Sequence, residues 1–274
     1  MIFSDSKEGV APPDYPAQTE VTQLLGVLEQ QGCLLLRQAL PLKPLTALHW
    51  RALQAYNRAD THFALGQLSE AETNLYRYGH VPPQACYPAG DPFLALAHLL
   101  EPLLPLLTAI TEDPVLLYQN SLFRRQQPQS ASAPPLPWHQ DAAFLGKVSP
   151  VWNIWCPLVS CGEQAPGLEI LLLNPTEVLA PPRLPEGHVL KAGDAYELYA
   201  FPPEWLQLHY PEVPVWLPTM QVGDVLLFHE RILHRTGLRP SMNLPRLSLE
   251  LRISAAAAAQ GCDSLLVPLT ESRE

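Results

Sequence analysis

Proline most constrains what this sequence can form, with 31 prolines against 14 glycines in 274 residues. Proline removes a backbone N–H donor and fixes φ, so dense proline shortens regular elements and stiffens the connections between them. Long helices are therefore expected only in the N-terminal half, at about 19–32, 43–57 and 93–111, the last with prolines at 102 and 105. Between the first two, the apolar run 32–40 is more typical of a strand.

From about residue 114 the pattern changes to short apolar runs separated by Gly, Pro and Asp. There are eight such runs: VLLYQNSLF, VWNIWCPLV, LEILLLN, HVLKA, VPVWLP, VGDVLLFH, RLSLELRIS and SLLVPL. Short strands between turn signals are typical of a two-sheet β-sandwich or jelly roll. We therefore expect a mainly β fold with flanking helices, as one domain over residues 1–274. Its helical part would cover about 1–112 and its jelly-roll core about 113–274.

Two stretches are less regular. The segment 126–137, QQPQSASAPPLP, is expected to be a flexible or polyproline-like loop. For Ala255–Ala259 the sequence allows either a helical turn or the end of a strand.

Charge and hydropathy limit the partners. Twenty-seven acidic against 17 basic residues give a formal net charge of −10, which disfavours a nucleic-acid partner because phosphate binding needs a basic face. The opening MIFSDSKEG has no apolar region behind it, and no apolar run approaches the ~20 residues of a membrane helix. We expect a cytoplasmic protein with a small-molecule substrate, no membrane association and no obligate protein partner.

The five cysteines are scattered and odd in number, and no CxxC pair occurs: Cys33, Cys86, Cys156, Cys161 and Cys262. A disulfide framework is not expected, and reduced, buried thiols are the default.

Trp138-His139-Gln140-Asp141 follows the proline-rich loop. In an extended chain, side chains two residues apart point to the same side, about 6–7 Å apart at their Cα atoms. His139 and Asp141 can therefore offer an imidazole and a carboxylate to one metal ion. An HxD pair alone is a weak signal, because it often occurs by chance.

A second segment, GDVLLFHERILHRT at 223–236, is an apolar strand that we expect to end in a histidine ligand. Two histidines and one carboxylate leave open positions on an ion, the geometry of non-haem Fe(II) oxygenases. His229 and His234 compete for the third position. Arg246 lies 12 residues beyond His234 and 17 beyond His229, and the shorter connection suits a ligand near the end of one strand and an arginine near the start of the next. We therefore favour His234 and interpret His229 as a buried histidine.

Together these residues resemble the phytanoyl-CoA dioxygenase-like family of 2-oxoglutarate oxygenases. The resemblance covers most of the chain: EQQGCLLLRQALPLKPLTAL, WHQD, VWNIWCPLVSCGEQAPGLEILLLNP, and GDVLLFHERILHRTG with PRLSLELRI. The sequence departs from the family where Leu173-Asn174-Pro175 replaces its usual Pro-Gly-Ser-His turn. The region 176–220 is also poorly matched. That region normally helps to shape the substrate pocket, so no relative's substrate is carried over.

The resemblance implies a role for each matching position. His139, Asp141 and His234 match the iron ligands, and Arg246 matches the residue that pairs with the distal carboxylate of 2-oxoglutarate, a task suited to a planar guanidinium. Further matches to cosubstrate-contacting positions are Ser248, Thr236 and Trp155; ordinary strand or core packing is the alternative for each. Gln119 and Arg125 are the candidates for polar substrate contacts, with solvent-facing positions as the alternative.

The resemblance implies a dioxygenase that uses Fe(II), 2-oxoglutarate and O2, and that hydroxylates an unactivated C–H bond of a small metabolite with release of succinate and CO2. Related halogenases replace the metal-binding carboxylate with a small residue, and Asp141 retains it, which favours hydroxylation or a related oxidation. Two alternatives remain: a metal-dependent hydrolase or isomerase on a cupin-like barrel, and a binding or sensor protein without chemistry.

Overall fold

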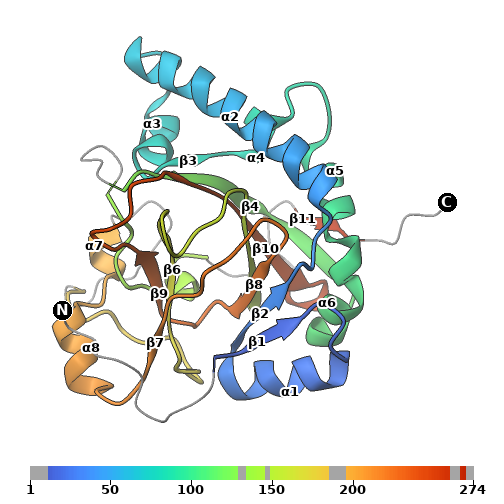
Figure 1. The fold of residues 1–274 in the computed structure, drawn as a ribbon, viewed down its shortest axis with the longest axis vertical. Coiled ribbons are helices and arrows are strands. Elements are labelled where there is room, and N and C mark those ends of the chain that lie inside the picture. Colours follow the sequence, from blue (N-terminus) through green and yellow to red (C-terminus); the bar gives the residue numbers. More distant parts are fainter. Residues whose placement is uncertain (1–11, 129–133, 146–148, 185–195, 260–265, 270–274) are drawn as a thin grey trace.

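The computed structural model describes residues 12–128, 134–145, 149–184, 196–259 and 266–269, without the side chains of residues 119, 259, 266 and 267. Two β-sheets face each other, with helices along one side of the larger sheet (Figure 1). The larger sheet has the order β1-β2-β8-β5-β10-β4-β11, with β3 beside β4, and the smaller has the order β7-β6-β9.

The larger sheet contains β1 (Asp14–Pro16), β2 (Cys33–Arg37), β3 (His80–Val81), β4 (Val115–Gln126), β5 (Val151–Pro157), β8 (Val225–His229), β10 (Arg246–Ala255) and β11 (Leu266–Pro268). The smaller sheet contains β6 (Gly167–Leu171), β7 (Val215–Trp216) and β9 (His234–Gly237). Seven of the eight apolar runs thus contain strands. The eighth, HVLKA, lies outside the described residues, as do residues 129–133 of the proline-rich loop.

The helices are α1 (Val21–Gln31), α2 (Leu42–Ala64), α3 (Glu70–Arg77), α4 (Pro83–Cys86), α5 (Pro92–Leu100), α6 (Leu104–Thr111), α7 (Tyr196–Tyr199) and α8 (Pro203–His209). Three single 3₁₀ turns are η1 (Glu101–Leu103), η2 (Asp141–Ala143) and η3 (Ala257–Ala259). Helix α2 extends seven residues beyond the expected end at 57. The expected helix over 93–111 is divided by η1 because Pro102 and Pro105 lack the N–H that a continuous helix needs.

The segment Pro92–Thr111 is long and apolar enough, by length and composition alone, to cross a membrane, with a mean hydropathy of 1.8. The expectation that no run approaches this length was therefore wrong. In the structure the segment is α5, η1 and α6, and the apolar side chains of Leu96, Leu100 and Leu107 pack in the core that α5 and α6 share with the large sheet.

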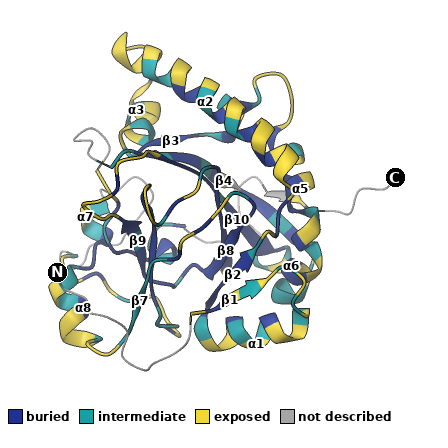
Figure 2. Cartoon of the chain, viewed as in Figure 1, coloured by how far each residue is buried: buried dark blue, intermediate teal, exposed yellow. Residues whose placement is uncertain are grey.

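Alternation along the strands divides the interior into two layers. On β10, Leu247, Leu249, Leu251 and Ile253 join the core shared with the helices, while the residues between them point toward the smaller sheet. A second core cluster lies between the two sheets and includes Trp155, Leu168 and Phe228. Figure 2 shows the strands buried and the outer helix faces exposed.

Cys33, Cys86, Cys156 and Cys161 are buried free thiols, as expected, and Cys262 lies outside the described residues. Burial raises the pKa of the Cys33 thiol to about 12, so it is protonated at neutral pH.

Candidate metal centre

A short antiparallel bridge brings the two predicted histidine ligands together, although 95 residues separate them. The backbone N–H of His139 donates to the carbonyl of His234 at 3.0 Å, and that of His234 donates to the carbonyl of His139 at 3.1 Å. His234 opens β9 at this bridge. Their imidazole rings lie 4.3 Å apart, centroid to centroid.

Both imidazoles are oriented by the same local hydrogen bond. Nδ1 of His139 lies 2.7 Å from the carbonyl of Pro137, and Nδ1 of His234 lies 3.0 Å from that of Ile232. A carbonyl only accepts, so each Nδ1 carries the ring proton and each Nε2 presents a lone pair. Burial and, to a smaller extent, the neighbouring His139 lower the pKa of His234 to about 4. At neutral pH its ring is a neutral ligand.

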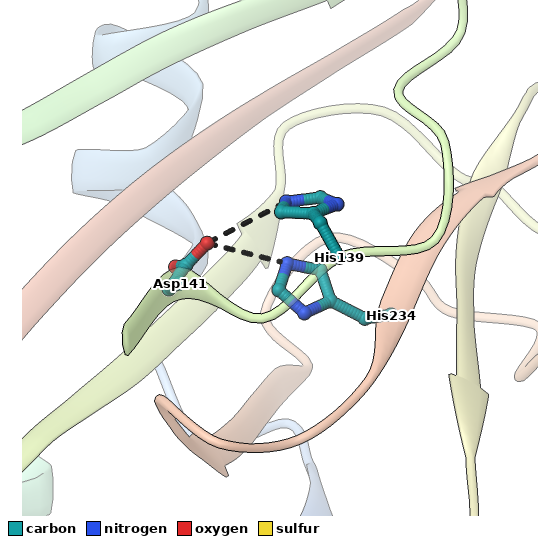
Figure 3. A group of neighbouring side chains, drawn as sticks. All are labelled: His139, Asp141 and His234. Carbon is teal, nitrogen blue, oxygen red and sulfur yellow. Dashed lines mark ion pairs between the residues drawn. The ribbon is translucent and has the colours of Figure 1, made fainter. Parts of the chain in front are cut away.

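Asp141 completes the group (Figure 3). Gln140 is extended, so His139 and Asp141 project to the same side, as predicted, and Asp141 then begins η2. Its Oδ1 lies 3.5 Å from Nε2 of His139 and 3.6 Å from Nε2 of His234. Burial raises the pKa of Asp141, but the charge of Arg252 and the two histidines outweigh this effect and hold the pKa well below its ordinary value.

These three side chains fit a divalent cation. Their candidate ligand atoms all lie within 4.8 Å of one another, and all three residues are buried. Two imidazole lone pairs and a carboxylate oxygen repel one another unless a cation lies between them. Among the described residues no fourth His, Cys, Asp or Glu joins the group, so the protein supplies three ligands and leaves positions for small molecules.

The cavity beside the triad is rich in polar nitrogen atoms that have no hydrogen-bond partner in the described residues. Five side chains that line it have a buried nitrogen without a hydrogen-bond partner in the described part of the chain: His80 Nε2, Arg124 Nε, Asn153 Nδ2, Trp155 Nε1 and Arg252 Nε. Buried donors are normally satisfied. Ligands rich in hydrogen-bond acceptors would satisfy the donors among these nitrogens.

Arg246, at the start of β10, is fully buried. Its Nη1 donates to the carbonyl of Gly167 at 2.9 Å, whereas Nε and Nη2 have no hydrogen-bond partner in the described residues. The guanidinium lies over Trp155, 5.3 Å from the ring centroid to Cζ. Burial lowers the pKa of Arg246 to about 10, and Arg124 adds to this effect, yet the group remains charged at neutral pH. Its free edge suits the two-pronged binding of a carboxylate.

The other predicted cosubstrate residues lie near this group. Trp155 and Thr236 line the cavity with the triad. The Thr236 hydroxyl accepts a hydrogen bond from the N–H of Leu136 at 3.1 Å, and its own proton remains for a ligand. Ser248 is fully buried on β10, two residues from Arg246 on the same face.

The structure does not bring Arg125 to the cavity. Its guanidinium forms an ion pair with Asp60 of α2, with Nη1 3.0 Å from Oδ2, and it lies over the ring of Tyr56. The alternation of β4 instead turns Arg124 inward. The side chain of Gln119 lies outside the described residues.

One further expectation is revised. The strand β8 ends at His229, and His234 opens the next strand rather than ending one. His229 points away from the triad and packs edge-on against Trp152, 4.9 Å between ring centroids. Sequence analysis also missed Arg252, which contacts Asp141, although its spacing of six residues from Arg246 on an alternating strand is a usable signal.

No family model matches the chain. Among solved structures, it is similar to the epimerase SnoN in complex with Fe3+, alpha ketoglutarate and nogalamycin RO, with a TM-score of 0.56 and 18% identity over 92% of this chain and 96% of that one. The chain has the fold of non-haem alpha ketoglutarate-dependent enzymes.

Two other structures extend the comparison. AviO1 from Streptomyces viridochromogenes Tue57 has a TM-score of 0.56 and 17% identity over 87% of this chain and 96% of that one. The non-haem alpha ketoglutarate-dependent carbocyclase SnoK from nogalamycin biosynthesis has a TM-score of 0.51 and 15% identity over 88% and 86%. Because one neighbour is an epimerase and another a carbocyclase, the shared fold does not determine which reaction follows.

Proposed function

We propose that the chain is an Fe(II)- and 2-oxoglutarate-dependent oxygenase of the phytanoyl-CoA dioxygenase-like type, built on a jelly-roll core. The observation that carries this proposal is the convergence of His139, Asp141 and His234, each with one ligand atom directed at a common point. The likeness in fold to enzymes that use iron and alpha ketoglutarate supports the same assignment.

The chain's own residues would act as follows. His139, Asp141 and His234 would hold Fe(II), and Arg246 would bind the distal carboxylate of 2-oxoglutarate through its free N–H groups. Thr236 and Ser248 would donate hydroxyl hydrogen bonds to that cosubstrate, and Trp155 would pack beside it. Burial of the site excludes water from the reacting groups. When bound, the iron would supply the oxidative chemistry with O2, coupling conversion of 2-oxoglutarate to succinate and CO2 with oxidation of a substrate C–H bond.

The first test is anaerobic addition of Fe(II) and 2-oxoglutarate to the protein. We expect a visible charge-transfer band in the wild type and none in His139→Ala. In air, we expect succinate to form with O2 consumption in equal amounts. A metal-dependent hydrolase or isomerase would produce neither signal. A sensor protein would show the band, but no turnover with any substrate of a broad metabolite panel.

We propose hydroxylation of a small organic metabolite as the reaction, because Asp141 retains the carboxylate ligand. Epimerisation or ring closure is the second candidate, favoured by the reactions of the neighbours SnoN and SnoK. Product analysis under ¹⁸O2 distinguishes them. Hydroxylation adds one labelled oxygen atom to the product, whereas epimerisation leaves the mass unchanged and ring closure lowers it by two hydrogens.

A further inference from the structure

Arg124 lies on the inward face of β4, opposite Ser248 of β10 and His80 of β3. Its side chain is almost completely buried and lines the cavity beside the metal ligands. Nη2 donates to the side-chain oxygen of Gln126 at 2.9 Å, and Nε has no hydrogen-bond partner in the described ranges. A buried guanidinium is costly to desolvate unless an anion compensates it.

Two other buried arginines, one lining the cavity and one beside it, differ from Arg124 in this respect. Arg252 contacts Asp141 at 3.1 Å, and Arg246 has Glu250 at 4.0 Å. No ion pair joins Arg124 to any carboxylate in the described part of the chain; Glu250 influences it only at longer range. Burial accordingly lowers the pKa of the Arg124 guanidinium from its usual value.

The side chains at the cavity carry one more positive charge than negative charges. The guanidinium groups of Arg124 and Arg252 line the cavity, and that of Arg246 adjoins it, over the ring of Trp155 and 4.0 Å from Glu250. These three groups face two carboxylates, those of Asp141 and Glu250. Arg235 at the edge is paired with Glu169. A divalent cation and the dianion 2-oxoglutarate cancel each other, so the excess of one charge persists in the loaded site. A buried site with one uncompensated cation suits a ligand with one negative charge.

The surroundings of Arg124 favour an organic acid over an inorganic anion. His80 presents Nε2 without a partner in the described residues, and burial lowers its pKa to about 3, so its neutral ring adds a hydrogen-bonding group but no charge. Tyr196 also lines the cavity, and its ring packs edge-on against His139, 5.6 Å between centroids. Phe144 lies 6.0 Å from Tyr196. The ring of Tyr196, supported by Phe144, offers an apolar surface to the body of a ligand.

We propose that Arg124 binds the carboxylate of the primary substrate, which is therefore a monoanionic organic acid. This inference rests on the proposed function, because it assigns the 2-oxoglutarate carboxylates to the metal and Arg246. Arg124 is then a specificity-determining residue: it places the acid group at the β3–β4 end of the cavity and turns the body of the substrate toward the metal.

The test uses protein loaded with Mn(II) and 2-oxoglutarate and measures binding by calorimetry. The probes are benzoate and 4-phenylbutyrate, each compared with its uncharged amide. We expect at least one acid to bind the wild type roughly tenfold more tightly than its amide. Arg124→Gln should remove this preference while 2-oxoglutarate affinity stays within about twofold. Arg124→Lys should keep part of the preference, and Glu250→Gln, which removes a repelling charge, should strengthen acid binding.

Three results would overturn the proposal. In the first, neither acid binds the wild type better than its amide, and in the second, Arg124→Gln retains the full preference. In the third, Arg124→Gln lowers the affinity for 2-oxoglutarate tenfold and leaves acid binding unchanged, which would assign Arg124 to the cosubstrate. If Arg124→Gln does not fold, Arg124→Lys and Glu250→Gln still test the proposal, because the first should weaken the preference for the acid and the second should strengthen acid binding. Repeating the titrations without metal separates the two proposals. If the protein binds neither Mn(II) nor 2-oxoglutarate but still binds the acid through Arg124, the oxygenase proposal fails and the Arg124 proposal stands.

Discussion

Nη2 of Arg252 lies 3.1 Å from Oδ2 of Asp141, and both side chains are buried. Arg252 also donates through Nη1 to the carbonyl of Asn120, which holds the guanidinium in place. The second oxygen of the carboxylate is thus occupied, and Oδ1 alone faces Nε2 of His139 and His234. If Asp141 binds the metal as proposed, Arg252 is a positioning residue for that ligand.

Replacing Arg252 should weaken metal binding without removing any ligand. For Arg252→Gln we expect about 10–100-fold lower affinity for Mn(II), the usual effect of losing a group that orients a metal ligand. Arg252→Lys, which retains the charge, should recover part of the loss. Calorimetric titration with Mn(II) measures this directly. Wild-type affinity in Arg252→Gln would show that Asp141 is oriented without this contact.

Removing a histidine of the triad should abolish stoichiometric iron binding. His139→Ala and His234→Ala each leave two ligands, and we expect less than one tenth of the wild-type iron content after reconstitution. His229→Ala is the matched control: the ring lies five residues from His234 but packs against Trp152. It should bind one equivalent. Metal analysis after desalting measures the iron content of each variant. Loss of iron in His229→Ala at retained stability would contradict the assignment.

Arg246→Gln should weaken 2-oxoglutarate binding while iron content is unchanged. Losing charged hydrogen bonds to the distal carboxylate costs about 1.5–3 kcal/mol, roughly 10- to 150-fold in Kd. Arg125→Gln is the neighbouring control, since Arg125 pairs with Asp60 outside the cavity. Titration of Fe(II)-loaded protein with 2-oxoglutarate, followed by the charge-transfer band, gives the Kd of each protein. Equal affinity in Arg246→Gln and wild type would remove Arg246 from the cosubstrate site.

Acid should destabilise the metal-free protein before most carboxylates protonate. Burial lowers the pKa of His80 to about 3 and that of His229 to about 4, below the ordinary 6.5. The unfolded chain therefore binds more protons below pH 6.5. The contribution of these histidines to the free energy of unfolding is complete above that pH. It falls by about 1.4 kcal/mol per pH unit for each such histidine as the pH drops toward the folded value. Denaturant titrations from pH 7 to 5 measure the slope, which His229→Asn should reduce; an identical slope would contradict this origin.

Much of the site could be predicted because its signals are local. The spacing of His139 and Asp141 in an extended chain predicts a shared side, and the structure confirms it. Likewise, the alternation of β10 places Arg246, Ser248, Glu250 and Arg252 on one face. The same periodicity could have identified Arg252, which was missed, but only the position of Asp141 beside it shows what Arg252 does.

Other features had no local signal. Arg124 and Arg125 are adjacent, and β4 is polar on both faces at this point, so alternation does not say which arginine points inward. Pairing with β10 and β3 decides it. His229 and His234 posed the same difficulty, since both follow an apolar run. The shorter connection to Arg246 favours His234, and the bridge from His139 to His234 brings that residue into the triad.

The sequence by itself determined the strand-rich C-terminal half, the proline-interrupted helices and the residues able to bind a metal, because periodicity and residue chemistry act over a few neighbouring positions. Only the tertiary structure decided which histidine joins the triad, which arginine faces the cavity and which charges remain uncompensated there. Those outcomes depend on strand pairing and sheet packing between segments far apart in the sequence, such as Arg124 with Ser248 and His139 with His234. They depend also on burial, which sets the electrostatic cost of each charge.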